Sequence, residues 1–554
     1  MTQWSSVGEA VVAALEAWGV DTGFGVISIH NMPILDAIGR RNRIRFVPAR
    51  GEAGAVNMAD AFARVSGRLG LAVTSTGTGA GNAAGALVEA ETAGTPLLLL
   101  TGQVESAYVD RGMGFIHEAK DQAGMLRAIS KAFFRIDRPE AAIPILRKAV
   151  ATALSAPTGP VSIEIPIDIQ RAPVEAVVGP PPQPDAVPRA SDEEIDALAA
   201  RLLAAKRPLL WVGFGCLDAR EAVGRLADMG IAVVTSAHGR AILPEDHPGS
   251  LGVFNQSPAS EAFYATCDAF LVAGSRLRGN ETRQYSLKLP TPLYRVDANP
   301  ERRDGDYPAA LSICADAGDV LTRLADRLDG RLTIDPALAK DVATARLEAE
   351  ADLRAAIKPY DRLVDALAAA APSDFVWARD ITISNATWGN RLPALSDPRN
   401  AVHPLGGGIG QGLAMGIGAA LAAPGRKTAA LIGDGAFMLN VGELATAVEA
   451  KADMAIILMN DGGYGVIRNI QDARYEGRHY FADLHTPDFG GLAASIGAAH
   501  RTVRAVDEMQ GALEEAFATA GPAIVEIDMA AIGPFARPFA GPPMAKKAQA
   551  EAAR

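Results

Sequence analysis

Two short motifs are the most informative part of the sequence: Gly433-Asp434-Gly435 and, after a spacer, Asn460-Asp461-Gly462-Gly463-Tyr464. The first motif follows an apolar run at residues 428–432, and the second follows another at residues 455–459. The spacer places Leu444, Ala447 and Val448 at helical intervals, which predicts a helix between two buried strands. A right-handed β–α–β crossover brings both strand ends to one edge of a parallel sheet, where ligands bind in open α/β folds.

The two carboxylates of these motifs, Asp434 and Asp461, are therefore expected to lie close together. Hard oxygen ligands beside glycines suit Mg²⁺, which keeps other coordination positions for phosphate oxygens and water. The glycine-rich segment at residues 403–418 can add backbone N–H donors and a helix N-terminus for a phosphate. A lone Gly-Asp-Gly is more often a β-turn, and the specificity comes from the pair at two strand ends.

The composition limits the class of protein. The 554 residues are 49% hydrophobic and 21% charged, with a net charge of −11, so we expect two to four globular domains without nucleic-acid binding. The three cysteines are scattered, which argues against both disulfides and a zinc site. No signal pattern or long apolar run is present, so we expect a cytoplasmic protein that does not span a membrane.

Alternating strand and helix patterns divide the chain into three parallel-sheet α/β domains. We expect them at residues 1–171, 192–335 and 355–535. A proline-rich linker is expected at residues 172–191, and a Pro/Ala/Lys-rich mobile tail at 536–554.

Four segments carry a resemblance to a known family: residues 50–70, 74–87, 433–443 and 483–489. With them the chain resembles the thiamine-diphosphate enzymes of the acetohydroxyacid (acetolactate) synthase and 2-oxo-acid decarboxylase type, over nearly its whole length. The resemblance implies a pyrimidine-binding, a middle and a diphosphate-binding domain. It also implies a homodimer or homotetramer with active sites at the subunit interface, acting on a small carbonyl or 2-oxo-acid substrate.

The resemblance also assigns roles to single residues. Glu52 matches the glutamate that hydrogen-bonds N1′ of the aminopyrimidine and so assists acid–base activation of the cofactor. Ile409, after Gly408, matches the apolar residue that holds the cofactor bent. The implied Mg²⁺ ligands are Asp434, Asp461 and the main chain of Gly463, and the other implied cofactor contacts are Gly433, Gly435, Ala436 and Tyr464.

The chain departs from its best-known relatives around the expected substrate. Ser75 stands where the benzoylformate-decarboxylase type has a catalytic histidine, and Ile467 stands near a glutamate of pyruvate decarboxylases. These departures leave His30 and His117 as candidate proton-transfer groups, because an ordinary histidine pKa of about 6.5 suits that work. An isolated histidine is equally often structural. The middle domain resembles a part that holds FAD or ADP in some relatives, with residues 274–276 (Gly-Ser-Arg) as the candidate contact.

The sequence thus predicts an enzyme that makes or breaks a carbon–carbon bond next to a carbonyl, with a decarboxylase/carboligase activity favoured. The alternative within the family is a lyase or hydrolase acting on a diketone or a 2-hydroxyacyl compound. A nicotinamide oxidoreductase, suggested by Gly77, Gly79 and Gly81, lacks the acidic residue that such a fingerprint needs at the second strand end. A non-catalytic subunit is disfavoured because Glu52 and both metal carboxylates are present.

Overall fold

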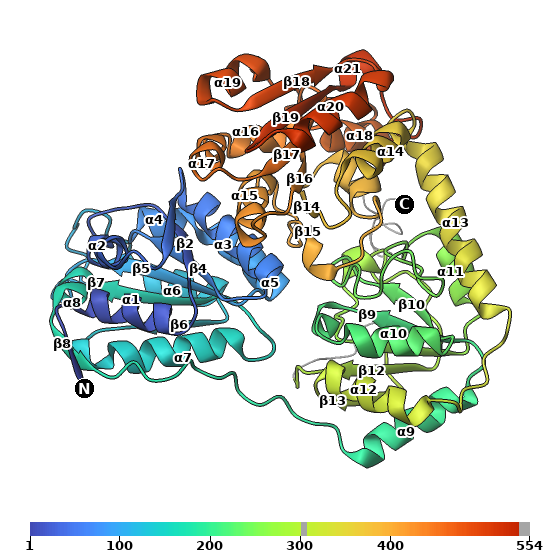
Figure 1. The fold of residues 1–554 in the computed structure, drawn as a ribbon, viewed down its shortest axis with the longest axis horizontal. Coiled ribbons are helices and arrows are strands. Elements are labelled where there is room, and N and C mark those ends of the chain that lie inside the picture. Colours follow the sequence, from blue (N-terminus) through green and yellow to red (C-terminus); the bar gives the residue numbers. More distant parts are fainter. Residues whose placement is uncertain (301–306, 542–554) are drawn as a thin grey trace.

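The computed structural model describes residues 1–300 and 307–541. Figure 1 shows three α/β domains, coloured blue to teal, green to yellow, and orange to red along the chain. Each is built on its own parallel sheet, of six, five and six strands. The prediction of three parallel-sheet domains is confirmed.

The N-terminal sheet has the strand order β3-β2-β4-β5-β7-β6. Its central strands are buried along their whole length, which is why they read as continuous apolar runs in the sequence. The strands are β2 (Thr22–Gly25), β3 (Arg45–Pro48), β4 (Gly70–Thr74), β5 (Leu97–Gln103), β6 (Ala132–Arg135) and β7 (Val161–Pro166). The helices are α1 (Val7–Ala17), α2 (Met32–Arg41), α3 (Glu52–Ser66), α4 (Thr78–Asn82), α5 (Ala84–Ala93), α6 (Gln122–Ile129), α7 (Ala142–Leu154) and α8 (Ile167–Arg171).

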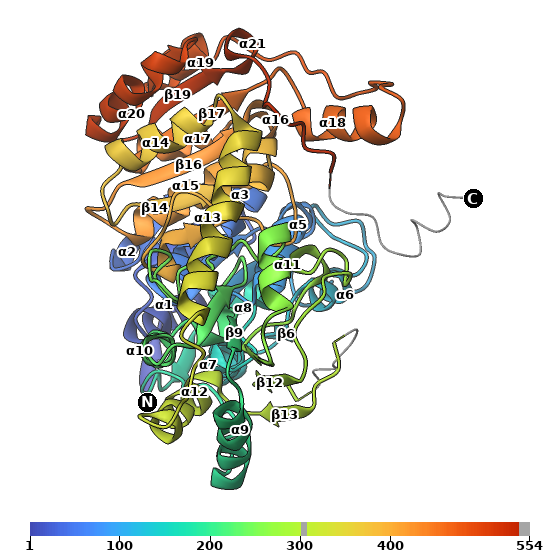
Figure 2. The same ribbon diagram turned by 90° about the vertical axis from the view of Figure 1, so that its right-hand side faces the viewer.

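The middle sheet has the order β10-β9-β11-β12-β13. Its first helix begins at a capping box in which Ser191 and Glu194 satisfy each other's backbone N–H groups. The strands are β9 (Pro208–Val212), β10 (Ala232–Thr235), β11 (Ala269–Ala273), β12 (Leu293–Asp297) and β13 (Leu311–Cys314). The helices are α9 (Asp192–Ala204), α10 (Arg220–Asp228), α11 (Pro258–Tyr264) and α12 (Ala317–Leu328), and the long α13 (Leu338–Ile357) runs up to the C-terminal domain, as Figure 2 shows.

The C-terminal sheet has the order β15-β14-β16-β17-β19-β18. Its strands are β14 (Val376–Arg379), β15 (Ala401–Val402), β16 (Thr428–Gly433), β17 (Met454–Asn460), β18 (Ala499–Val503) and β19 (Ala523–Asp528). The helices are α14 (Asp361–Ala370), α15 (Gly412–Ala422), α16 (Asp434–Leu439), α17 (Glu443–Glu449), α18 (Gly465–Arg474), α19 (Phe489–Ile496), α20 (Met509–Ala518) and α21 (Met529–Ile532).

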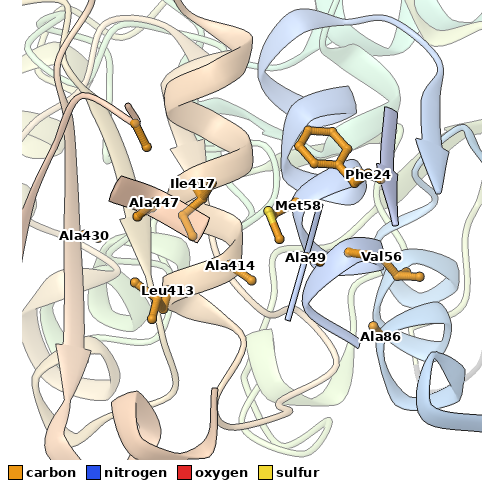
Figure 3. Close-up of a cluster of buried hydrophobic side chains, with 14 of the residues drawn as sticks. Phe24, Ala49, Val56, Met58, Ala86, Leu413, Ala414, Ile417, Ala430 and Ala447 are labelled. Carbon is orange, nitrogen blue, oxygen red and sulfur yellow. The ribbon is translucent and has the colours of Figure 1, made fainter. Parts of the chain in front are cut away.

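Helix α3 of the first domain packs against helix α15 of the third domain. Figure 3 shows them side by side, with Met58 facing Leu413, Ala414 and Ile417. Small residues permit the close approach, since a Cβ on Gly418 would lie 2.1 Å from the backbone oxygen of Met58. The two domains therefore share one hydrophobic core.

Two details differ from the expected boundaries. The proline-rich stretch contains a short strand, β8 (Val174–Ala176), which pairs antiparallel with β1 (Thr2–Trp4). The start of the expected mobile tail is held, because Ala536 and Arg537 donate backbone hydrogen bonds to Lys358 and Ala356, whereas residues 542–554 lie outside the described part. No described helix is long and apolar enough to cross a membrane.

Candidate active site

Asp434 and Asp461 meet at the carboxyl edge of the C-terminal sheet, as predicted. Strands β16 and β17 are paired in register up to Gly433 and Met459. Asp434 opens α16 with only 1% of its surface exposed, and the backbone N–H of Asp461 points at its Oδ1 from 3.4 Å. Gly435 leaves room for the ring of Tyr464, which a Cβ there would approach to 2.8 Å.

The electrostatics of this pair favour a bound cation. Burial, and then the negative charge of Asp461, raise the pKa of Asp434 to about 7. Burial also raises the pKa of Asp461, against the opposing effect of Arg468, whose Nη2 lies 3.0 Å from Asp461 Oδ1. Within the described residues, Asp434 Oδ2 is buried and accepts no hydrogen bond. Buried acceptors without donors are costly, and a divalent cation would satisfy this oxygen.

The glycine loop at residues 405–412 is held from two sides. Asp380, at the end of β14, accepts hydrogen bonds from the N–H groups of Gly410 and Gly412 at 3.0 and 2.6 Å. Asn440 Nδ2 donates to the Gly410 carbonyl at 2.5 Å. Ile409, between these anchors, keeps 41% of its surface exposed. The loop therefore presents an apolar side chain outward from a fixed backbone.

Sequence reasoning missed Asp380 and Asn440. Asp380 is fully buried, and burial raises its pKa to about 6 against the effect of three backbone N–H donors. It directly follows the buried strand β14, as Asp434 follows β16, so the same argument from strand ends could have found it. The partners of Asn440 depend on the tertiary fold, and no local pattern indicates them.

Glu52 lies in the N-terminal domain as the first residue of α3. Its Oε2 accepts a hydrogen bond from Asn82 Nδ2 at 3.1 Å. A Cβ on Gly79 would lie 2.9 Å from Glu52 Oε1 and 2.8 Å from Ser75 Cβ. Glu52 and Ser75 therefore flank the same glycine.

The two candidate histidines also meet beside Ser75. The rings of His30 and His117 have their centroids 5.3 Å apart. Ser28 Oγ donates to Ser75 Oγ at 2.8 Å, and Ser75 Oγ lies 3.2 Å from His117 Nδ1. The position that carries a histidine in some relatives thus has a serine here, in contact with a histidine from another loop.

His30 is the more buried of the pair, with 6% of its surface exposed. Burial, and then the neighbouring His117, lower the pKa of His30, so the neutral ring is favoured. Among the described residues its Nδ1 has no hydrogen-bond partner. A neutral imidazole with an unused ring nitrogen can accept or relay a proton.

A separate cavity of about 950 Å³ lies against the middle domain. It opens where the strand order reverses between β9 and β11, the position at which doubly wound sheets bind ligands. The loops after these strands touch through glycines, since a Cβ on Gly213 would lie 2.5 Å from the Gly274 oxygen. Phe214 and His238 stack at 4.1 Å within the lining.

Comparison with known proteins places the whole chain in one family. Residues 5–125, 195–324 and 382–527 match the N-terminal TPP binding domain, the central domain and the C-terminal TPP binding domain of thiamine pyrophosphate enzymes; thiamine pyrophosphate is another name for thiamine diphosphate.

Curated relatives cover nearly the same length. The chain is 34% identical over 545 residues to a probable 2-ketoarginine decarboxylase of Pseudomonas aeruginosa, with 94% of each chain covered. It is 29% identical to the acetolactate synthase isozyme 1 large subunit of Escherichia coli, with 94% of this chain and 93% of the relative covered. The nicotinamide-oxidoreductase alternative finds no support in these matches. The chain belongs to the thiamine pyrophosphate enzymes, of the acetolactate synthase and 2-oxo-acid decarboxylase type.

Proposed function

We propose that this enzyme uses thiamine diphosphate and Mg²⁺ to decarboxylate a 2-oxo acid, and that it can join the resulting acyl unit to a second carbonyl compound. The observation that carries the proposal is the pair of the buried Asp434 and the half-buried Asp461 at one sheet edge, together with Glu52 at the start of α3. When bound, the cofactor supplies a carbon centre that stabilises the carbanion left by loss of CO₂.

The residues of the chain have separate tasks in this scheme. Asp434, Asp461 and the main chain of Gly463 would hold Mg²⁺ against the diphosphate, beside Gly433, Gly435, Ala436 and Tyr464. Gly408 and Ile409 would support the bent cofactor. Glu52 would hold a proton at N1′ of the aminopyrimidine, and His30 or His117 would move a proton to or from the substrate oxygen.

The direct test is CO₂ release from a panel of 2-oxo acids by the enzyme loaded with thiamine diphosphate and Mg²⁺. The panel starts with pyruvate and 2-ketoarginine, because the relatives named above include a probable 2-ketoarginine decarboxylase and acetolactate synthases. We expect release from at least one acid, and none without the cofactor. Cofactor-dependent cleavage of a diketone or a 2-hydroxyacyl compound without CO₂ would favour the lyase or hydrolase alternative instead.

The metal site predicts a pH effect. The raised pKa of Asp434 means that the metal-free fold binds a proton that the unfolded chain releases, so this residue's contribution to stability is lost as the pH rises through about 7. Mg²⁺ needs the ionised carboxylate. The increase in Tm on adding Mg²⁺ and thiamine diphosphate should therefore be larger at about pH 8 than at about pH 6.

Asp434→Asn provides the control for this pH effect, because its side chain is neutral at both pH values. An increase in Tm that is equally large at both pH values in the wild-type protein would contradict the assignment.

His30 gives a further prediction. His30→Ala should lower kcat and flatten its dependence on pH, while the exchange of the cofactor C2 proton continues, since Glu52 serves that step. His117→Ala, measured in parallel, identifies which ring of the pair transfers the proton. If His30→Ala only lowers Tm and turns over normally with the same pH profile, His30 is a structural residue.

We also propose a homodimer or homotetramer with each active site shared between two chains. Apolar side chains are exposed around both halves of the site: Ile27, Ile29, Met113 and Ile116 beside the histidines, and Ile409, Leu439 and Ile467 beside the aspartates. A second copy would cover such surfaces.

The cavity of the middle domain suits the adenine nucleotide part of FAD or ADP. Denaturing the purified enzyme and recording the spectrum of what it releases separates flavin, adenine nucleotide and neither.

A further inference from the structure

The first and third domains have the same topology. If the strands of each sheet are numbered along the chain, both sheets have the order 2-1-3-4-6-5. Helices α3 and α15 both follow the second strand, and α5 and α17 both follow the third. The helix after the third strand carries one buried glutamate in each domain. These are Glu89 on α5 and Glu443 on α17, both 2% exposed.

Glu443 reaches from the C-terminal domain to the start of α3. Its carboxylate accepts hydrogen bonds from the backbone N–H groups of Arg50 at 3.1 Å and Gly51 at 3.0 Å. Thr446 Oγ1 adds a third hydrogen bond at 2.8 Å. The N-cap residue Gly51 has no side chain that could cap α3, so Glu443 supplies the capping acceptor from another domain.

Glu89 makes the equivalent contact in the opposite direction. Its carboxylate accepts hydrogen bonds from the backbone N–H groups of Leu405 at 2.6 Å and Gly406 at 2.7 Å, the first two residues of the glycine loop. Arg64 holds it from α3 at 3.0 Å. The two glutamates are therefore related in contact as well as in topology.

From this reciprocity we propose that Glu443 and Glu89 are positioning residues, each of which sets from the opposite domain an element that holds the cofactor. Glu443 fixes the first turn of α3 and thereby the carboxylate of Glu52. Glu89 fixes the loop that leads to Gly408 and Ile409. The inference deepens the proposed function and depends on the cofactor roles assigned there to Glu52 and Ile409.

Two glycines show that the carboxylates need this close approach. A Cβ on Gly54 would lie 2.1 Å from Glu443 Oε1, and a Cβ on Gly406 would lie 2.9 Å from Glu89 Oε2. Gly54 lies inside α3, where alanine would favour the helix more. Gly54→Ala should therefore displace the Glu443 carboxylate while it stabilises α3. A slower C2 exchange in this variant can then not be attributed to a weaker helix.

The test measures two quantities on the enzyme with saturating Mg²⁺: the exchange rate of the C2 proton of bound thiamine diphosphate, and its Kd. In Glu443→Gln, an amide NH₂ replaces one of the two carboxylate oxygens that accept hydrogen bonds from these N–H groups, so one acceptor is lost. We expect C2 exchange to slow by about 10- to 100-fold, with Kd little changed, although Glu443 lies in the diphosphate-binding domain. Gly54→Ala should reproduce this result.

Glu89→Gln should instead raise the Kd of thiamine diphosphate by about 10-fold or more, although Glu89 lies in the domain that carries Glu52. The matched control is Glu449→Gln. Glu449 also joins α17 to Arg50, at 2.6 Å, but through an exposed ion pair with the Arg50 side chain, so neither quantity should change.

Each substitution should therefore impair the cofactor contact made by the other domain, not by the domain that carries the substituted glutamate. If Glu443→Gln and Gly54→Ala both exchange C2 at the wild-type rate when saturated and only melt at lower temperature, the glutamates serve domain packing and the inference is overturned. Failure of the proposed function looks different, because the wild-type enzyme would then bind no thiamine diphosphate or would leave its C2 exchange at the rate of free cofactor.

Discussion

Replacing Asp434 with alanine is expected to raise the Kd of Mg²⁺–thiamine diphosphate by about 100-fold or more and to abolish activity. The residue is buried at the start of α16, and its Oδ2 accepts no hydrogen bond among the described residues. Loss of groups that only orient a metal ligand costs about 10- to 100-fold, so loss of the ligand itself should cost at least as much.

The metal-free fold should tolerate this change. The negative charge of Asp461 raises the energy of the charged form of Asp434, so removal of the Asp434 carboxylate relieves this repulsion at about pH 8. Titration calorimetry gives the Kd, and thermal unfolding gives the Tm of the metal-free protein. Asp472→Ala is the control, since Asp472 is an exposed carboxylate of α18 that pairs with His479. An unchanged Kd in Asp434→Ala would mean that the metal binds elsewhere.

Replacing Glu52 with glutamine should slow C2 proton exchange by about 10² to 10⁴-fold, while the Kd of the cofactor changes far less. Glutamine keeps the size of the side chain and one acceptor oxygen, but it cannot stabilise a proton on N1′. Its amide can still meet Asn82, which donates to Glu52 Oε2, so the start of α3 should remain intact.

The exchange rate is measured by acid-quenching the holoenzyme in D₂O and integrating the C2 proton signal by NMR. Glu449→Gln again serves as the control for the loss of one carboxylate. Exchange at the wild-type rate in Glu52→Gln would mean that another acidic residue stabilises the proton on N1′. A large increase in Kd with normal exchange would make Glu52 a binding residue.

Much of the fold could be predicted because buried parallel strands are continuous apolar runs. Strands β16 and β17 each lie within one residue of the apolar runs at residues 428–432 and 455–459. The two-residue strand β15 has too few residues to form a pattern.

The parts of the site that could be predicted are those that follow from the parallel direction of neighbouring strands. Asp434 and Asp461 were expected to meet because both follow parallel strands, and they do. The proximity of His30 and His117 could not be derived, since it depends on how two loops pack against Gly77 and Gly102.

The contacts between domains were the least predictable part of the site. Glu443 and Glu89 act through backbone N–H groups of another domain, which only the tertiary fold brings near them. The local sequence around a single Glu in a predicted helix does not indicate a hydrogen-bond partner in another domain.

The proposed function requires that Glu52 and Asp434 serve one cofactor, with each residue contributed by a different chain. The test is a heterodimer of Glu52→Gln and Asp434→Ala chains, co-expressed with two different tags and purified through both. Each variant alone should be inactive. The heterodimer contains one site with both mutations and one site with neither, so we expect about half of the wild-type activity per dimer. A heterodimer no more active than the two parent variants would show that the active site is not shared between two chains in this way.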